Sequence, residues 1–315
     1  MYMWKGGCGM SGKTVEAVIP VYKPGRELSR LLKRLDKQAV PLAKIHLMHT
    51  TDGEELTGLP ELETPVEIHS LGINEFDHAA TRHQGFTLCH SDYILCMTQD
   101  AVPVDSHLTE NLLAAFDDEM CALAYARQVA RKEHGAIEQY TRCFNYPAED
   151  RKQNLSRLEE LGIKTYFCSD ACALYKRDLY EQLGGFEQPA IFNEDMVYAY
   201  KLIQAGYSIQ YQAGARVYHS HRYTLCQQFR RNFDLGVSQA QHPEIFAAVS
   251  STSEGKRLVA GTAKHLIRHH HFLSLPYLIA VSGAKWLGYK AGHHYRHLSP
   301  VLIRSFTMNK NYWKP

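Results

Sequence analysis

Residues 93–100, Tyr93-Ile94-Leu95-Cys96-Met97-Thr98-Gln99-Asp100, form an apolar run that ends in an acidic turn. A short apolar run bounded by a turn is typical of a strand buried on both faces, as in a parallel sheet covered by helices. Ligands of such sheets bind beyond the carboxyl ends of the strands. Asp100 stands at that end, so this stretch predicts a central strand and a carboxylate at the ligand-binding edge.

Strand and helix patterns alternate along the chain around this run. Strands are expected over 14–21, 45–50, 93–98, 121–126 and 171–175, and helices over 26–38, 75–89, 106–118, 151–161 and 193–205. We expect Ser106 to cap the third helix and 127–150 to form a loop over the site. The alternation predicts an α/β fold with a parallel sheet. Asp52 follows the second strand, so it joins Asp100 at the same edge.

The composition of the chain limits the number of domains that it can form. The chain has 315 residues, of which 45% are hydrophobic, enough for one large domain or one domain with an appendage.

The charge of the chain is concentrated at its end. The last sixty residues contain ten Lys and Arg and no Asp or Glu, so their net charge is +10. Since the whole chain has a net charge of +2, the remainder carries −8. Such asymmetry indicates that the tail meets an anionic surface, either nucleic acid or acidic lipid. The apolar run 272–281 is broken by Pro276 and too short to span a bilayer, which favours a membrane surface over nucleic acid.

The cysteines indicate the compartment. Eight cysteines stand at irregular spacings without a CxxC pair, and the first apolar run, 15–22, is too short for a signal peptide. We therefore expect a reducing cytoplasm.

Two further motifs supply acids and imidazoles. Glu194 and Asp195 follow Asn193, which is expected to cap a helix and so to place both carboxylates where backbone N–H groups favour the charged form. A charged carboxylate can act as a general base. His219 and His221 follow a later apolar segment. Together with Asp100 these residues offer ligands and a base for transferring a group from a metal-bound diphosphate.

The ordered set of motifs carries a family resemblance. The set comprises Val18-Ile19-Pro20-Val21-Tyr22, Asp52, Phe76-Asp77-His78 with Arg82, Thr98-Gln99-Asp100, Gly184-Gly185-Phe186, Glu194-Asp195 and His219-Ser220-His221. From Val15 to Trp313 the chain resembles family 2 glycosyltransferases, and within them bacterial rhamnosyltransferases that build surface polysaccharides. The resemblance implies a GT-A fold, which is a Rossmann-like mixed sheet flanked by helices, here with a C-terminal helical extension. It also implies inversion at the anomeric carbon, a divalent cation, dTDP-L-rhamnose as donor and a saccharide on a polyprenyl diphosphate as acceptor.

The expected elements, the charge of the tail and the resemblance together predict a domain plan. Residues 1–13 would be a flexible extension, 14–240 the catalytic domain and 241–315 a basic helical extension. Within the catalytic domain, 14–126 would bind the nucleotide-sugar and 127–240 the acceptor. The enzyme would work in the cytoplasm, peripherally at the inner face of the cell membrane, with its C-terminal helices on the lipid. Packing of those helices on the catalytic domain, or between two copies in a homodimer, is the alternative.

Roles at the donor site follow residue by residue from the resemblance. Pro20 and Tyr22 would line the nucleoside pocket, and Asp52 would accept a hydrogen bond from the base. His78 and Arg82 would face the diphosphate.

The metal and the base also follow from it. Asp100, preceded by Gln99, takes the last position of the DxD motif and would bind Mg²⁺ or Mn²⁺. Since Thr98 and Gln99 replace the usual acids, His219 or His221 would complete the site, which favours Mn²⁺. Asp195, beside Glu194, would be the base. The acceptor or the diphosphate would meet three arginines, namely Arg127, Arg230 and Arg231.

Two alternatives differ in class. The stretch Gly7 to Thr14 fits the P-loop pattern GxxxxGK[ST], yet it leads into an expected strand rather than a helix, which argues against an ATPase. A non-catalytic scaffold that binds a sugar nucleotide or a lipid is compatible with the missing DxD acids. The presence of Glu194-Asp195 argues against it.

Overall fold

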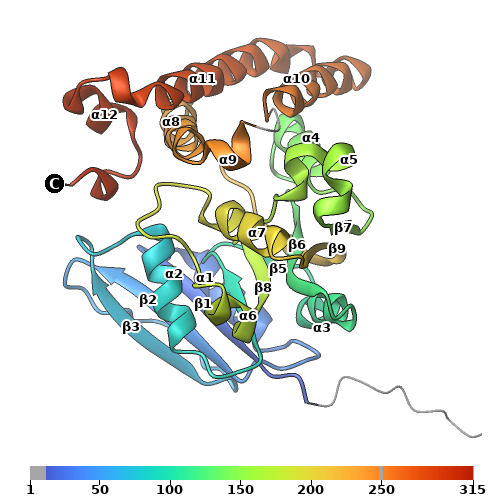
Figure 1. Ribbon diagram of the computed structural model, residues 1–315, viewed down its shortest axis with the longest axis vertical. Helices are drawn as coiled ribbons and strands as arrows, with labels where there is room; N and C mark the ends of the chain where they lie inside the picture. The colour runs from blue at the N-terminus through green and yellow to red at the C-terminus, as the bar shows by residue number, and fades with distance from the viewer. Residues whose placement is uncertain (1–11, 248–250, 315) are drawn as a thin grey trace, which may run out of the picture.

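The computed structural model describes residues 12–247 and 251–314. Within these residues nine strands form one mixed sheet in the order β3-β2-β1-β4-β8-β6-β9-β5, with β7 paired to β9 (Figure 1). The strands are β1 (Val15–Tyr22), β2 (Lys44–Thr51), β3 (Val66–Gly72), β4 (Tyr93–Met97), β5 (Val102–Pro103), β6 (Cys121–Val129), β7 (Arg151–Gln153), β8 (Cys172–Lys176) and β9 (Ser208–Tyr218). Strands β1 to β4 pair in parallel, whereas β8 is antiparallel to both β4 and β6.

Helices cover both faces of this sheet. The helices of the first 205 residues are α1 (Arg26–Leu35), α2 (His78–Thr87), α3 (Leu108–Ala114), α4 (Ala136–Asn145), α5 (Leu158–Leu161), α6 (Arg177–Gln182) and α7 (Glu194–Gln204). One hydrophobic core lies under α1 and α3, and a second lies under α2, α6 and α7. Helix α1 buries Leu28, Leu31, Leu32 and Leu35, the spacing of one helical face. Strand β4, which the sequence predicts as a central strand, is buried along its whole length.

The sequence-based elements differ from the structure at several places. The third helix begins at Leu108 after His107, so Ser106 is not its cap. The segment expected as a loop over 127–150 contains the end of β6 and all of α4. The helix expected over 151–161 is instead β7, a short 3-10 turn and α5.

Two long strands escaped the sequence analysis for different reasons. Strand β3 is an edge strand with exposed polar positions, so it has little apolar alternation. Strand β9 does alternate, with every second residue from Ile209 to Val217 buried, and this period-2 signal was present in the sequence.

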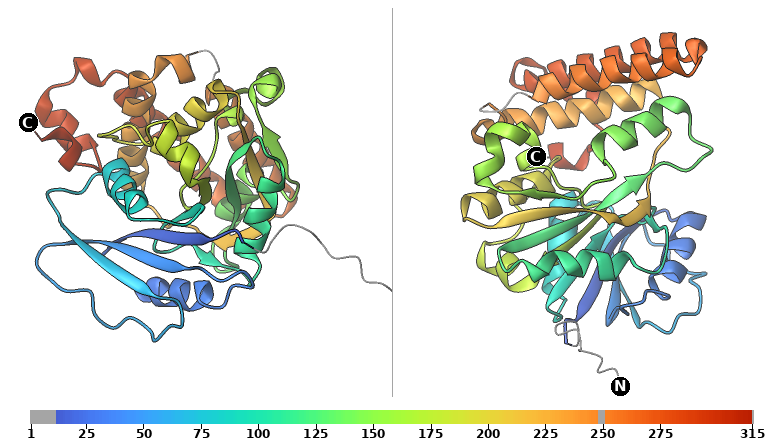
Figure 2. Two further views of the ribbon diagram at one scale, coloured as in Figure 1. Left: turned by 60° about the horizontal axis from the view of Figure 1, so that its bottom comes forward. Right: turned by 90° about the vertical axis from the view of Figure 1, so that its right-hand side faces the viewer.

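Five helices follow the sheet and gather at one end of the molecule (Figures 1 and 2). They are α8 (Leu225–Gln241), α9 (Pro243–Phe246), α10 (Ser251–Arg268), α11 (Leu275–His293) and α12 (Pro300–Phe306). Helices α8 and α11 approach so closely that a Cβ atom at Gly288 or Gly292 would lie 2.1 or 2.0 Å from a backbone oxygen of α8. Within the described residues, no helix combines the length and hydropathy needed to cross a membrane.

The C-terminal segment folds back toward the first half of the chain. The buried carboxylate of Asp234 in α8 accepts hydrogen bonds from the Thr307 hydroxyl and from the backbone N–H groups of Met308 and Asn309. Farther on, Asn311 Nδ2 donates to the Ile73 carbonyl at 2.6 Å. The loop before α2 is thereby tied to the end of the chain.

Candidate active site

The carboxyl ends of β1, β2 and β4 carry the residues expected at the donor site. Tyr22 ends β1 and is 40% exposed, and Asp52 lies exposed just after β2. The Gln99 side chain follows β4 and pairs with the backbone of Tyr22: Nε2 donates to its carbonyl at 2.9 Å, and Oε1 accepts from its N–H at 3.0 Å. Gln99 therefore joins two strand ends at the position where the resemblance leads one to expect an acid.

Asp100 lies against both histidines of the His-x-His pair. Its carboxylate oxygens are 3.7 Å from His219 Nε2 and 3.5 Å from His221 Nδ1. One ligand atom from each of the three residues falls within 4.8 Å of the other two, close enough to share one cation. The structure brings together both histidines that the sequence offered as alternatives.

Gln128 in β6 fixes the tautomer of His219. Arg142 can only donate hydrogen bonds, so the Gln128 side-chain atom that it contacts is the amide oxygen, Oε1. An amide oxygen only accepts, so His219 Nδ1, 2.8 Å from the same atom, is the donor of that hydrogen bond. His219 then carries its proton on Nδ1 and presents the lone pair of Nε2 to Asp100. Metal-ligating histidines are commonly oriented in this way by a hydrogen bond to the second ring nitrogen.

The electrostatic surroundings keep these imidazoles neutral. Burial, the neighbouring His221 ring and the cations Arg142 and Arg231 hold the pKa of His219 well below its usual range. The pKa of His221 is also lowered, mainly by burial, although Asp100 acts in the opposite direction. Neutral imidazole is the form that binds metal.

A buried ion-pair group lies at the amino end of α7. Arg82 of α2 donates from Nη1 to Glu194 Oε1 at 2.8 Å, and its Nε is 3.4 Å from Asp170 Oδ2. Tyr175 donates a hydrogen bond to the other oxygen of Asp170. Asp170 was missed by the sequence analysis because it precedes β8 in no recognisable motif. The contacts of Arg82 are with carboxylates of this chain, whereas we expected a diphosphate there; its role toward the donor stays a prediction.

Asp195 adjoins this group but remains partly accessible. Its Oδ2 accepts from the Asp170 backbone N–H at 3.2 Å, and its Oδ1 accepts from the Met196 N–H at 2.8 Å. Burial and the charges of Asp170 and Glu194 raise its pKa well above the usual range of a carboxyl. The helix amino end was expected to favour the charged form of Asp195, but burial and the neighbouring carboxylates outweigh the backbone N–H groups, so the net shift of its pKa is upward.

Asn193 does not cap α7 through its side chain either. Its backbone is left-handed, with φ of 62°, a conformation that Asn tolerates better than most residues. Its Nδ2 donates instead to Ser238 Oγ of α8 at 3.0 Å. The residue therefore ties the start of α7 to the C-terminal helices.

The histidine cluster and the carboxylate group are physically connected. Gln128 Nε2 donates to Ser169 Oγ at 2.9 Å, one residue before Asp170. The Thr98 N–H donates to the Ala171 carbonyl, so the ends of β4 and β8 lie side by side. The two groups thus share one edge of the sheet.

The other residues expected at the site have different surroundings. The pKa of His78 is lowered to about 4, chiefly by burial and also by the charges of Arg82 and Arg231. Arg231 in α8 stacks on Phe192 and Tyr223, at 4.7 and 5.7 Å. Arg230 is half-buried on the same helix. The side chain of Arg127 lines a cavity of about 490 Å³ together with Asp105, Asn111 and Asp150, and neither histidine is among the residues that line it.

Most of the P-loop-like stretch lies outside the described residues, as does most of the expected extension 1–13. The last residue of the P-loop-like stretch, Thr14, is described. Its backbone N–H and its hydroxyl each donate a hydrogen bond to Asp92 Oδ2 at 2.9 Å. The chain continues directly into β1. A phosphate-binding loop needs a helix at this point, so the structure argues against an ATPase.

Comparison with known proteins identifies close relatives. Residues 17–184 match the family model for glycosyl transferase family 2. The O-antigen chain rhamnosyltransferase RfbN of Salmonella typhimurium is 33% identical, over 95% of this chain and 96% of its own length. The O-antigen chain rhamnosyltransferase WbaN of Salmonella anatum is 32% identical, over 94% of both chains.

Solved structures show the same fold at low identity. The mannosyltransferase PcManGT from Pyrobaculum calidifontis, solved with GDP-Man and Mn²⁺, superposes with a TM-score of 0.60 at 13% identity, covering 91% of this chain and 89% of its own. S. aureus TarS 1-349 with UDP-GlcNAc gives a TM-score of 0.50 at 12% identity, covering 90% and 91%. The expected GT-A fold, a mixed sheet flanked by helices with a C-terminal helical extension, is confirmed.

Proposed function

Because this chain belongs to glycosyltransferase family 2 and is a glycosyltransferase, we propose that it transfers L-rhamnose from dTDP-L-rhamnose to a lipid-linked saccharide in the synthesis of a bacterial surface polysaccharide. The similarity to two O-antigen rhamnosyltransferases over nearly the whole chain carries this proposal. The arrangement of Asp100, the two histidines and Asp195 at one sheet edge supports it.

A divalent cation fits the residues at this edge. Asp100, His219 and His221 would hold it, since their ligand atoms converge and His219 Nε2 is already turned toward Asp100. Two imidazoles favour Mn²⁺ over Mg²⁺. When bound, the cation would neutralise charge on the departing nucleotide diphosphate.

Asp195 is the proposed general base. It would take the proton from the acceptor hydroxyl while that oxygen attacks the anomeric carbon from the face opposite the nucleotide, which inverts the configuration. A base is most effective when its pKa lies near the working pH, and burial together with the carboxylates around Asp195 shifts its pKa upward, in that direction. Arg82 would hold Glu194 and Asp170 in place through its two ion pairs.

The donor and the acceptor would enter from different elements. Pro20, Tyr22 and Asp52 would contact the nucleoside at the ends of β1 and β2. Arg231, stacked on two aromatic rings near the histidines, is the arginine best placed for the diphosphate or the acceptor. Arg230 keeps this proposed role, whereas the position of Arg127 at a cavity that neither histidine lines weakens the case for Arg127.

The C-terminal helices are proposed to rest on the inner face of the cell membrane. Leu273 is 96% exposed and Ile279 is 73% exposed on this part of the chain. Exposed cations lie among the apolar residues, namely Lys264, Arg268, Lys290, Arg296 and Arg304. Apolar side chains mixed with cations are the composition of a surface that binds acidic lipid. A homodimer contact through the same helices is the competing proposal.

Calorimetric titration with dTDP-L-rhamnose and with UDP-, GDP- and CDP-sugars, each with Mn²⁺ and with Mg²⁺, tests the donor. We expect dTDP-L-rhamnose to bind at least about tenfold more tightly than the others, with Mn²⁺ more effective than Mg²⁺. Preference for another nucleotide-sugar would overturn the rhamnose assignment. Binding of none would favour a non-catalytic scaffold that binds lipid.

A further inference from the structure

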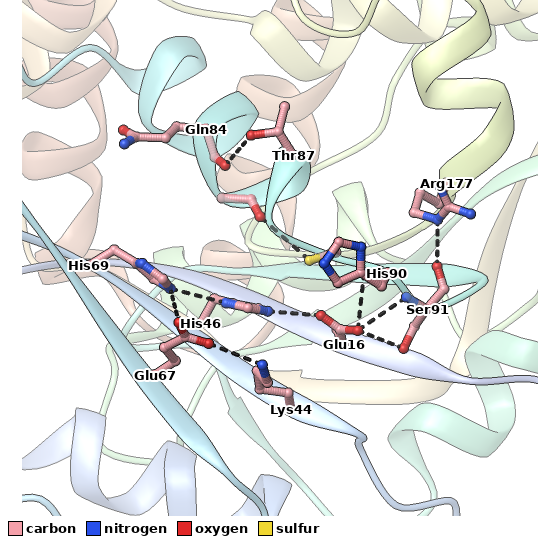
Figure 3. Close-up of polar contacts among 12 residues, drawn as sticks. Glu16, Lys44, His46, Glu67, His69, Gln84, Thr87, His90, Ser91 and Arg177 are labelled. Carbon is pink, nitrogen blue, oxygen red and sulfur yellow. Dashed lines mark hydrogen bonds and ion pairs between the residues drawn. The ribbon is translucent and has the colours of Figure 1, made fainter.

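A second group of ligand-forming side chains lies on the sheet away from the proposed active site. Glu16 is the second residue of β1 and His46 the third residue of β2, so both lie near the amino ends of their strands. Tyr22, Asp52 and Asp100 follow the carboxyl ends of parallel strands. Figure 3 shows His46 between Glu16 and His69, with Glu67 of β3 beside His69.

His46 lies between a carboxylate and a second imidazole. Its Nε2 is 2.8 Å from Glu16 Oε2, and its Nδ1 is 3.1 Å from His69 Nε2 (Figure 3). Glu67 Oε1 is 3.9 Å from the same nitrogen of His69. Ligand atoms of His46, His69 and Glu67 lie within 4.8 Å of one another.

Glu16 fixes which nitrogen of His46 faces His69 without a proton. Its Oε1 accepts from the N–H groups of His90 and Ser91 and from the Ser91 hydroxyl. Three donors on Oε1 stabilise the charged carboxylate, and a charged carboxylate only accepts hydrogen bonds. His46 therefore donates from Nε2 and presents the lone pair of Nδ1 to His69. A carboxylate behind a histidine is the usual support of a metal ligand.

The other two ligands are accessible and partly pre-positioned. Burial lowers the pKa of His69, which favours the neutral ring. Lys44 Nζ lies 3.0 Å from Glu67 Oε2 and leaves Oε1 turned toward His69. Two imidazole nitrogens on a tetrahedral ion, each about 2.0 to 2.1 Å from it, lie about 3.4 Å apart. The distance between His46 Nδ1 and His69 Nε2 needs little change to meet that value.

We propose that His46, His69 and Glu67 form a second divalent-metal site suited to Zn²⁺, with water as the fourth ligand. Two imidazoles and one carboxylate suit Zn²⁺ better than Mg²⁺ or Ca²⁺. The site joins β2 to the edge strand β3, so its role is to fasten that edge rather than to act on the donor. Cys89 also lies close to Glu16 and His46, but its thiol is buried and donates to the Gly85 carbonyl, so the proposal takes the accessible ligands His69 and Glu67 instead.

The test must separate this site from the cluster of Asp100, His219 and His221, whose carboxylate and two imidazoles are also suitable ligands for Zn²⁺. The full chain carrying Asp100→Ala and His221→Ala, freed of metal, provides the background for titration with ZnCl₂ by calorimetry. We expect one Zn²⁺ per chain in this background. Adding His69→Ala or Glu67→Gln, both at accessible positions, is expected to weaken that binding by at least about tenfold, the scale of losing a ligand or its support.

A matched control and a spectrum complete the test. His90 has an exposed side chain and contacts Glu16 through its backbone N–H, so His90→Ala should leave Zn²⁺ binding unchanged. Co²⁺ bound in the background variant should give the visible absorption of tetrahedral coordination, which His69→Ala removes. Absence of Zn²⁺ binding in the background variant, or binding that both substitutions leave unchanged, would overturn the proposal. Neither result bears on donor binding, so the proposed glycosyl transfer stands or falls separately.

Discussion

Gln128 Oε1 accepts a hydrogen bond from His219 Nδ1 at 2.8 Å, and this bond turns the free nitrogen of His219 toward Asp100. Gln128 therefore acts on the proposed metal site through His219. The Nε2 of Gln128 donates to Ser169, so the same residue also connects the proposed metal ligands to the carboxylates around Asp170.

Replacing Gln128 should therefore weaken metal binding without removing a ligand. For Gln128→Ala we expect Mn²⁺ affinity to fall by about 10- to 100-fold, as is usual when the partner of a ligating histidine is lost. Calorimetric titration of Mn²⁺ measures this. Gln84→Ala, on the exposed side of α2, is the matched control and should bind Mn²⁺ normally. Equal affinity in the two variants would contradict the positioning role.

The pH dependence of turnover should depend on Asp170. Burial raises the pKa of Asp170 to about 6, while Arg82 opposes that shift, so this carboxyl is charged at neutral pH and raises the pKa of Asp195. A general base fails when the pH falls below its pKa. Asp170→Asn removes the charge, lowers the pKa of Asp195 and should move the acidic limb of kcat/KM to lower pH.

A pH profile of kcat/KM for Asp170→Asn checks this direction. Asp178→Asn, which changes an exposed acid at the start of α6, serves as the control and should keep the wild-type limb. An acidic limb that stays in place or moves to higher pH in Asp170→Asn would exclude the proposed coupling.

The crossing of α8 and α11 gives a test of the fold. A Cβ atom at Gly292 would lie 2.0 Å from the Phe233 carbonyl oxygen, which neither backbone can relieve easily. Gly292→Ala should lower the free energy of unfolding by about 1 to 3 kcal/mol, the usual cost of overpacking. Gly283→Ala in the same helix meets no atom within 4 Å and should raise it by about 0.5 to 1 kcal/mol. Chemical denaturation of both variants measures the two free energies of unfolding. A similar change in the two variants would contradict the close crossing of α8 and α11.

The proposed membrane surface is testable by substitution, because truncation would expose the core between α8 and α11. The double variant Leu273→Ser with Ile279→Ser changes two exposed side chains, and Leu155→Ser changes one exposed side chain outside the C-terminal helices, in the 3-10 turn after β7. We expect the wild type and Leu155→Ser to float with anionic vesicles at low salt and the double variant to remain in solution. Equal flotation of all three would contradict the lipid role. Loss of a dimer in the double variant, with flotation unchanged, would favour the homodimer.

Much of the central sheet was predictable, because β1, β2 and β4 are buried on both faces and their side chains reflect it. The prediction was poorest where tertiary contacts replace local signals. Asn193 follows the pattern of a helix cap, yet Ser238 of α8 draws its side chain away. The glycines of α11 carry no local sign that they meet α8.

The site shows the same division. Asp100, His219 and His221 were found by motif, since strand ends at one edge of a parallel sheet bring distant residues together. Asp170 and Gln128 act through neighbours that are distant in sequence, and no spacing rule points to them. The raised pKa of Asp195 could not be inferred either, because it depends on Asp170 and Glu194 in three dimensions.

Turnover of Asp195→Asn tests the central claim most directly. The measurement is the transfer of labelled rhamnose from dTDP-L-rhamnose to the lipid fraction of acceptor-containing membranes, with Mn²⁺ and donor saturating. The account predicts a fall in kcat of roughly a hundredfold or more, the scale of general-base catalysis, with donor affinity by calorimetry unchanged. Near-normal kcat in Asp195→Asn would contradict the assignment of Asp195 as the base.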